Sequence, residues 1–157
     1  MTNPKMSEVS FQNLPPMKMA CYQVVSREPE DEGGKFMDAW IEARDLQGGR
    51  RFGFDVPVTA EQARAGIRGY EQWHSVPNDV TGADGVMVRS FPGGRYAVLR
   101  LFDPFTAPFE TIPAGWRYLH EWMQSHPEIK CGYHPCLEEL VPGEAGGMDL
   151  ILYYPIG

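Results

Sequence analysis

Ile67–Val76 reads IRGYEQWHSV, and the rest of the chain can be organised around this stretch. Its aromatic and β-branched residues favour a strand, in which successive side chains point to opposite faces. Glu71 and Trp73 therefore stand on one face, a carboxylate next to a large aromatic ring. A similar stretch, Cys136–Leu140 (CLEEL), follows later, with Glu138 on the same face as its two end residues. Two acid-bearing strands in matching positions indicate a duplicated fold with a pocket between its copies.

The composition is typical of a folded protein of one domain. The chain has 157 residues, of which 43% are hydrophobic and 12% aromatic, and this excludes a disordered chain. The formal net charge of -7 argues against binding to nucleic-acid phosphates and is compatible with a neutral or cationic ligand. No apolar run approaches the roughly 18 residues of a membrane span, and no signal peptide is recognisable. We therefore expect a cytoplasmic protein with no direct contact to nucleic acid or membrane.

Neither the cysteines nor the four histidines stand at spacings typical of a metal site. Cys21, Cys131 and Cys136 are odd in number, and we expect reduced, mostly buried thiols. No serine lies in the context of a nucleophile elbow, and no thiol is placed toward a base. We therefore expect no metal, no cofactor and no catalytic residue.

Hydrophobic periodicity divides the chain into two halves of similar order. Residues 1–16 contain three prolines and no periodicity, so we expect a flexible N-terminal tail before a domain at 17–157. In the first half we expect a strand, a helix and two strands, at Met17–Ser26, Gly34–Leu46, Arg51–Val56 and Ile67–Val76. A helical turn at Ala60–Ala65 is also expected. In the second half we expect two strands, a helix and two strands, at Val86–Phe91, Arg95–Phe102, Glu110–Ser125, Cys136–Val141 and Met148–Pro155.

This order predicts an α+β fold. Duplicated strand–helix–strand–strand units would form an antiparallel sheet with two helices on one face. In the second helix, Pro113 fits the first turn, where a missing N–H costs no hydrogen bond.

The chain resembles the GyrI-like small-molecule-binding superfamily, which shares the SOUL-like fold. This superfamily includes effector-binding domains of multidrug-sensing and AraC-type transcription regulators, stand-alone gyrase-inhibitor-like proteins and SOUL haem-binding relatives. The resemblance covers residues 17–157 and rests on Gly69–Trp73 before Val76–Pro77, Phe91–Val98, the helical stripe Ile112, Trp116, Leu119 and Trp122, Leu137–Glu139, and Tyr154–Ile156. It implies a pocket for aromatic, often cationic compounds, whose recurrent acid corresponds to Glu138. An acidic residue common four positions before the final proline is replaced here by Ile151.

The candidate ligand-binding residues are acids and aromatic rings: Glu138, Glu71, Trp73, Tyr154, Trp116 and Trp40. A carboxylate is costly to bury unpaired, but beside aromatic rings it attracts a cation, and each ring adds about 0.5–2 kcal/mol of cation–π attraction. Glu138 could equally be exposed or salt-bridged, and the helical stripes that hold Trp40 and Trp116 are also explained by core packing. Glu139 points away from Glu138 and is expected to be solvated.

The leading hypothesis is a stand-alone binding domain that senses or sequesters an apolar, aromatic or cationic small molecule. Glu138 would supply the counter-charge, and Trp73 and Tyr154 would stack on the ligand. One alternative is a hydrolase of reactive electrophiles in which Glu71 and Glu138 act as acid and base. Another is a gyrase-inhibitor-like protein that binds a partner protein, and a homodimer is also open. Haem binding is the least expected function.

Overall fold

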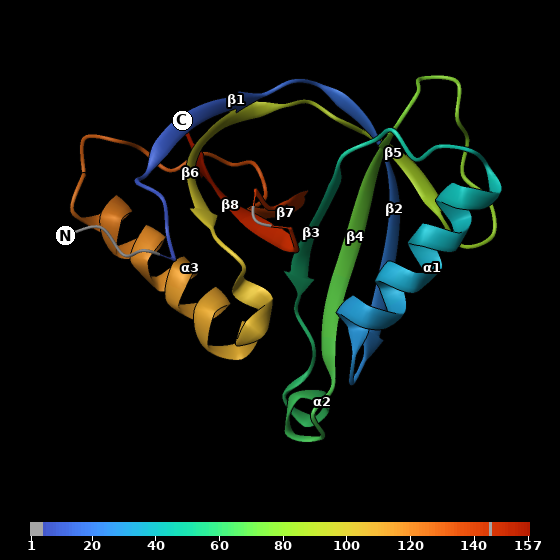
Figure 1. Ribbon diagram of the computed structural model, residues 1–157, viewed down its shortest axis with the longest axis horizontal. Helices are drawn as coiled ribbons and strands as arrows, with labels where there is room; N and C mark the ends of the chain where they lie inside the picture. Colours follow the sequence, from blue (N-terminus) through green and yellow to red (C-terminus); the bar gives the residue numbers. More distant parts are fainter. Residues whose placement is uncertain (1–4, 145) are drawn as a thin grey trace. The chain divides into compact units, whose positions relative to one another are not determined.

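The computed structural model describes residues 5–144 and 146–157 (Figure 1). The chain folds as two compact units, which we call the first unit, Pro16–Pro92, and the second unit, Gly93–Gly157 with the N-terminal segment up to Pro15. Each unit contains one long helix and four antiparallel strands. This confirms the expected α+β fold of duplicated units. None of the helices in the described part of the chain has the length and hydropathy that crossing a bilayer requires.

The strands of the first unit follow one another in the order β3-β4-β2-β5. Their bounds are β2 Met17–Ser26, β3 Arg51–Val56, β4 Arg68–Val76 and β5 Met87–Phe91. The helices are α1, Pro29–Ala43, and the short α2, Ala60–Arg64. α1 packs along β2 and β4, as Figure 1 shows. The core between them is apolar and consists of Ala20, Met37, Trp40, Ile41, Val76 and Val86.

α1 begins earlier than the predicted Gly34. Pro29 stands in its first turn, where a missing N–H costs no hydrogen bond, and acidic residues follow at the positive end of the helix dipole. Gly33 then lets the helix approach the sheet, because a Cβ at this position would lie 3.3 Å from Gln72 Cγ. The charged sequence of this turn resembles a loop, which is why the prediction missed it.

The strands of the second unit follow the order β1-β6-β8-β7. Their bounds are β1 Ser10–Leu14, β6 Gly94–Leu101, β7 Leu137–Pro142 and β8 Met148–Ile156. A short 3-10 turn, η1 (Pro104–Thr106), precedes the long helix α3, Pro108–Gln124. α3 packs on β6 and β8 around an apolar cluster of Ala97, Leu99, Leu101, Leu119, Met123, Leu150, Leu152 and Ile156.

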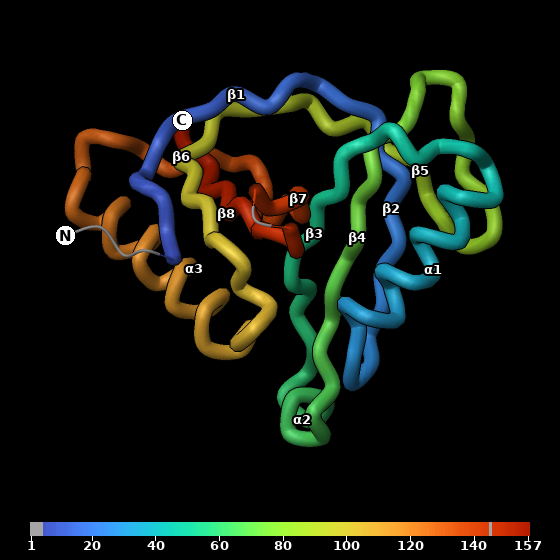
Figure 2. Tube along the Cα trace, viewed as in Figure 1, coloured from blue at the N-terminus to red at the C-terminus, as the bar shows by residue number. Residues whose placement is uncertain are grey.

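β1 corrects the expectation of a flexible tail over residues 1–16. The strand pairs with β6 from Ser10 opposite Val98 to Leu14 opposite Gly94, and the two run together in Figure 2. Residues 1–4 lie outside the described part of the chain. The sequence SFQNL lacks an apolar pattern because most of its side chains are exposed, so its backbone hydrogen bonds, rather than burial, define the strand.

α3 begins at Pro108, so Pro113 lies inside the helix and the prediction that it occupies the first turn is wrong. Two residues later, Gly115 brings the helix close to the strands. A Cβ on Gly115 would lie 2.8 Å from Leu101 Cδ2 and 3.1 Å from Leu152 Cδ1. Any side chain at position 115 would collide with these leucines, so glycine allows α3 to lie closer to β6 and β8 than another residue would.

Candidate ligand-binding site

One face of the first unit's sheet, pointing away from α1, combines an acid with aromatic rings. Successive side chains of β4 point to opposite faces of the sheet. Val76 belongs to the core under α1, and Glu71 and Trp73 lie an odd number of residues from it, so they point to the face away from α1. Paired residues of neighbouring strands share a face, and Trp73 pairs with Phe52 and Cys21. We call this set the Glu71 face; its members are Cys21, Phe52, Phe54, Glu71, Trp73 and Phe91.

Trp73 is the centre of the Glu71 face. Its Nε1 donates a hydrogen bond of 2.6 Å to Glu71 Oε2. The Phe54 ring stands edge-on to it, with centroids 5.1 Å apart and an angle of 88°, and the Phe91 ring is tilted at 5.8 Å and 60°. Glu71 itself is only 7% exposed. The structure thus brings two of the predicted residues, Glu71 and Trp73, into direct contact.

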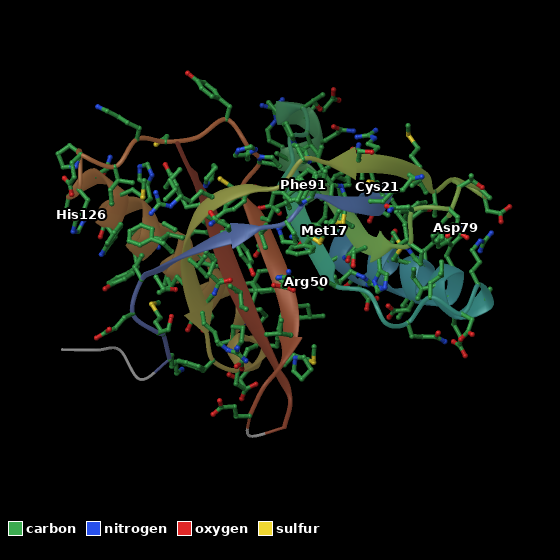
Figure 3. The ribbon with its side chains drawn as sticks, turned by 90° about the horizontal axis from the view of Figure 1, so that it is seen from above. Met17, Cys21, Arg50, Asp79, Phe91 and His126 are labelled. Atoms are coloured by element: carbon green, nitrogen blue, oxygen red, sulfur yellow. The ribbon has the colours of Figure 1, made fainter. Side chains whose placement is uncertain are left out.

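In the described part of the chain, no ion pair is recorded between Glu71 and a basic side chain. Among residues 5–144 and 146–157, the ion pairs recorded for Lys and Arg all go to other carboxylates. The indole N–H of Trp73 is neutral, so it satisfies one acceptor and leaves the charge in place. The charge acts on Cys21 of β2: burial, and then Glu71, raise the pKa of this thiol to about 12, and Arg89 opposes them. Figure 3 labels Cys21 on β2, where its partner on the adjacent strand β5 is Met87.

The second unit has a comparable face that combines an acid with aromatic rings, and the acid on this face is Glu139 rather than Glu138. Glu139 pairs with Ile151, away from the α3 cluster, and is 4% exposed. Its Oε1 accepts a hydrogen bond of 2.6 Å from Tyr153 Oη, and the Tyr96 ring stands edge-on to Tyr153 at 5.6 Å and 88°. The predicted direction of Glu139 is confirmed, but its predicted solvation is wrong, because the Tyr153 hydroxyl satisfies it inside the fold.

Glu138 lies on the other side of the same strand. It pairs with Leu152, which belongs to the α3 cluster, and is 9% exposed. Tyr154 and Trp116 are partly buried against this cluster. Tyr154 Oη lies 3.4 Å from His120 Nδ1, and burial, followed by the hydrogen bond with Cys131, raises the pKa of Tyr154. Three predicted residues, Glu138, Tyr154 and Trp116, therefore share the α3 side of the second unit.

The strand pairing corrects the predicted match between the two acid-bearing strands. β4, which carries Glu71, pairs with β2, the strand that precedes α1. In the second unit, the strand paired with β6, which precedes α3, is β8. β4 therefore corresponds to β8, whereas β7, with Glu138, corresponds to β3. Both stretches are strands, as predicted. The position of each strand in the sheet depends on which strands it pairs with, and the local sequence does not reveal this.

Trp40 packs in the core on the α1 side of the first unit, opposite the Glu71 face, and is 4% exposed. Its Nε1 donates a hydrogen bond of 3.1 Å to the Ala83 carbonyl oxygen. The Arg44 guanidinium carbon lies 4.1 Å from the centroid of its ring. These contacts fix α1 to the loop before β5.

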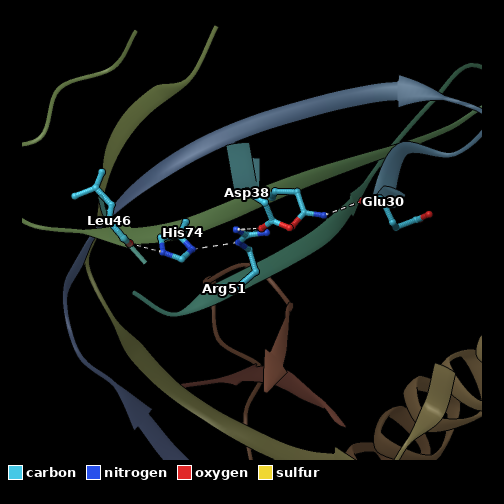
Figure 4. A network of polar contacts seen from close by, with 6 residues as sticks. Glu30, Asp38, Leu46, Arg51 and His74 are labelled. Carbon is cyan, nitrogen blue, oxygen red and sulfur yellow. Dashed lines mark hydrogen bonds and ion pairs between the residues drawn. The ribbon is translucent and has the colours of Figure 1, made fainter. Parts of the chain in front are cut away.

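A polar network also lies on the α1 side of β4 (Figure 4). Arg51 Nε donates to His74 Nδ1 at 3.2 Å, so the proton of the neutral ring sits on Nε2, 3.1 Å from the Leu46 carbonyl oxygen. Arg51 also pairs with Asp38 at 2.7 Å. Burial, and then the charge of Arg51, lower the pKa of His74. A cavity of about 400 Å³ nearby has no aromatic residue in its lining, so it does not fit the expected ligand class.

Comparisons with known proteins identify the family and the fold. The sequence profile of a family described as Cass2, integron-associated effector binding protein, matches residues 11–156. The crystal structure of the EcmrR C-terminal domain has a TM-score of 0.70 at 8% identity, with 96% of this chain and 97% of that chain covered. In the EcmrR–DNA complex, by contrast, this chain spans 57% of the EcmrR chain. No curated protein matches the sequence.

Two further structures share the fold. SAV2435 bound to tetraphenylphosphonium has a TM-score of 0.59 at 13% identity, covering 96% of this chain and 94% of that one. Integron cassette protein VCH_CASS2 from the mobile metagenome of Vibrio cholerae has a TM-score of 0.52 at 7% identity, covering 97% of each chain. These likenesses, together with the profile, confirm the resemblance to the GyrI-like superfamily. The chain belongs to the family of integron-associated effector-binding proteins.

Proposed function

We propose that the protein binds an aromatic cation on the Glu71 face. One observation carries the proposal: Glu71 is 7% exposed, and its recorded hydrogen bond comes from a neutral donor, Trp73. A buried carboxylate is costly unless it is paired. A cationic ligand would supply the missing counter-charge, so binding would relieve a cost that the free protein carries.

The aromatic rings around Glu71 support the same class of ligand. The ring of Trp73 contacts the rings of Phe54 and Phe91. Each aromatic ring whose face contacts a bound cation adds about 0.5–2 kcal/mol of cation–π attraction. The tetraphenylphosphonium bound to SAV2435, a relative in fold, is a cation of this kind. Membership of an effector-binding family supports a role in sensing or sequestering such a compound.

Glu138 stays in the proposal as a second candidate acid, with Tyr154 and Trp116 as its aromatic neighbours on the α3 side. Glu139 is a third, because it too is buried beside aromatic rings. Trp40 contributes only indirectly, by holding α1 in place. The three acids differ in their environments, so neutral substitutions at each position will separate their contributions.

The experiment is a titration of intrinsic tryptophan fluorescence with tetraphenylphosphonium. The variants are Glu71→Gln, Glu138→Gln and Glu139→Gln, and the control is Glu42→Gln, an exposed residue of α1 whose loss changes the net charge equally. We expect Glu71→Gln to weaken binding by at least about tenfold, or about 1.4 kcal/mol, and Glu42→Gln to leave it unchanged. Equal affinity in all the variants would show that no acid provides the counter-charge.

A second titration tests the ring assignment. Trp73→Phe removes one of the four tryptophans and keeps an aromatic ring next to Phe54. If the ligand contacts this face, the variant will lose most of the fluorescence change while retaining measurable binding by calorimetry. An unchanged fluorescence response in Trp73→Phe would place the ligand near another tryptophan and contradict the proposal.

A further inference from the structure

Two cysteines of the second unit are exposed, contrary to the expectation of mostly buried thiols. Cys131 and Cys136 flank the segment Gly132–Pro135, which leads into β7. Tyr133 in this segment projects fully into solvent, so small molecules can reach the segment. Cys21, in contrast, is 4% exposed and belongs to the first unit.

Both cysteines lie along the same edge of β8. Cys131 forms an antiparallel bridge with Ile156. Leu137, the first residue of β7, pairs with Tyr153, and continuing this register by one residue would put Cys136 opposite Tyr154. Tyr154 and Ile156 are two residues apart on one strand, so the positions opposite them are about 6.6 Å apart. Disulfides join residues whose Cα atoms are about 4.4–6.8 Å apart.

Continuing the register by one residue would also put the two thiols on the same side of the sheet. Ile156 and Tyr154 both face the α3 cluster, and residues paired across strands share a face. Cys131 Sγ lies 3.8 Å from Tyr154 Oη. The pKa of Tyr154 is raised by burial, by its hydrogen bond with Cys131, and by the charges of both Cys131 and Cys136, so the phenol senses both sulfurs.

The segment between the cysteines is held against the sheet in a fixed bulge. Gly132 N–H donates to the Pro155 carbonyl oxygen at 3.0 Å, and a Cβ on Gly132 would lie 2.8 Å from the Ile156 carbonyl oxygen. Tyr96 Oη donates to the Pro135 carbonyl oxygen at 3.2 Å. These contacts hold the bulge against β8 and Tyr96, between the Cys131–Ile156 bridge and the first pair of β7, Leu137 with Tyr153.

His134 does not turn this pair into a metal site. Its ring lies over Gly94, where a Cβ would be 2.6 Å from His134 Cδ2, and beside Tyr96 with centroids 6.1 Å apart. Tyr96 stands with Tyr153 on the face away from α3. The histidine therefore lies on the face opposite the thiol of Cys131, which is next to Tyr154 Oη. No group of three metal-binding side chains occurs among residues 5–144 and 146–157.

From this geometry we propose that Cys131 and Cys136 are a redox-active pair that closes reversibly to a disulfide when it meets a low-molecular-weight disulfide such as oxidised glutathione. The Cys131 thiolate attacks one sulfur of the oxidant, whose S–S bond breaks and releases one glutathione thiolate. The Cys136 thiolate then attacks the Cys131 sulfur and displaces the second glutathione. Two protein thiols are oxidised, one glutathione disulfide is reduced to two thiols, and the two protons pass to the leaving thiolates.

The environment of the two sulfurs supports this order of attack. Although Cys136 is exposed as a residue, partial burial of its side chain, and then the charge of Cys131, raise the pKa of its thiol. Cys136 is therefore less readily ionised than an ordinary thiol, and the proposal gives the first attack to Cys131. Cys21 serves as an internal reference, because burial raises its pKa to about 12 and withdraws it from the same oxidant.

The test uses the full chain in buffers of defined ratios of reduced to oxidised glutathione. After acid quenching, denaturation and alkylation, trypsin releases Cys131–Gly157 as one peptide, because neither Lys nor Arg follows Lys130. Cys21 is released separately in Met19–Arg27. In oxidising buffer we expect the first peptide to lose two hydrogen atoms and to carry no alkyl group. The second peptide stays fully alkylated, and dithiothreitol reverses the change.

Two controls test whether the folded structure and Cys136 are needed to close the disulfide. The same titration in urea measures the pair in the unfolded chain, and we expect the folded protein to close the disulfide at least about tenfold more favourably. In Cys136→Ser, Cys131 should instead retain one glutathione as a mixed disulfide. Free thiols throughout, glutathione on both cysteines, disulfide-linked dimers, or equal closure in urea would each overturn the proposal.

Discussion

Glu71 Oε2 accepts a hydrogen bond of 2.6 Å from Trp73 Nε1, two residues further along the same face of β4. The bond orients both side chains and leaves the carboxylate charged, because the indole donor is neutral. Hydrogen bonding and charge can therefore be separated experimentally. Glu71→Gln keeps an oxygen acceptor for Trp73 and removes the charge, whereas Trp73→Phe removes the donor together with part of the ring area.

The first prediction concerns this bond and the stability of the free protein. Trp73→Phe leaves Glu71 buried without its recorded donor, and we expect the free energy of unfolding to fall by about 1–3 kcal/mol beyond the loss of ring area. The same substitution in a Glu71→Gln background should cost less. Urea denaturation of the four proteins in a double-mutant cycle measures the difference, and additive costs would show that the two side chains are not coupled.

The second prediction concerns the matching pair in the second unit. Tyr153→Phe removes the hydroxyl that lies 2.6 Å from Glu139 Oε1 in a fully buried setting. We expect a loss of about 1–3 kcal/mol in the free energy of unfolding, again measured by urea denaturation. Tyr118→Phe, at a residue of α3 that is 46% exposed, is the matched control and should change the stability little. Equal effects at the two positions would contradict the structural role of the Tyr153 hydroxyl.

Glu138 and Glu139 show what the sequence could and could not reveal. Alternation along a strand shows that the two acids point to opposite faces, and the pairing of β7 with β8 confirms this. It does not show which face is buried, because both acids have apolar neighbours. In the structure both are buried, at 9% and 4% exposure, and Glu139 is satisfied by Tyr153, a residue distant in sequence.

The strands, too, could be predicted only in part from the sequence. The bounds predicted for Met17–Ser26 and Arg51–Val56 agree with β2 and β3, because β-branched and aromatic residues mark them and turn residues end them. β1 was missed because its pairing with β6 depends on backbone groups, which carry no sequence pattern. The exposure of Cys131 and Cys136 was also missed, because it is set by the bulge before β7 and not by the residue type.

The third prediction concerns pH. The pKa of His74 in the folded protein is lowered from the ordinary value of 6.5 by burial and by Arg51, while its bond to Leu46 and the charge of Asp38 oppose the shift. As the pH falls through that ordinary value, the unfolded chain takes up a proton that the folded chain does not, so the folded state loses stability. Between about pH 7.5 and about pH 5.5 we expect the free energy of unfolding to fall less steeply in His74→Gln than in the wild type. Parallel slopes would contradict the neutral, buried state of this ring.

The fourth prediction contrasts two helical glycines. In Gly115→Ala the new methyl would lie 2.8 Å from Leu101 Cδ2 in a fully packed core, which costs about 1–3 kcal/mol and outweighs the gain of up to about 1 kcal/mol in helix propensity. In Gly34→Ala the nearest atom is Gln72 Nε2 at 3.9 Å, so only the gain in helix propensity remains. Thermal denaturation should therefore show a lower melting temperature for the first variant and a higher one for the second. A higher melting temperature for both would show that α3 is not held tightly against the strands.

The most direct test of the central claim is the preference of the protein for a charged over a neutral ligand, measured by titration calorimetry. Tetraphenylphosphonium and the neutral triphenylphosphine oxide present similar rings and differ in charge. If Glu71 is the counter-charge, the wild type will bind the cation more tightly than the neutral compound. In Glu71→Gln this preference for the cation will fall by at least about tenfold, while the affinity for the neutral compound stays unchanged. An equal preference for the cation in the two proteins would contradict the assignment of the Glu71 face as the site that binds it.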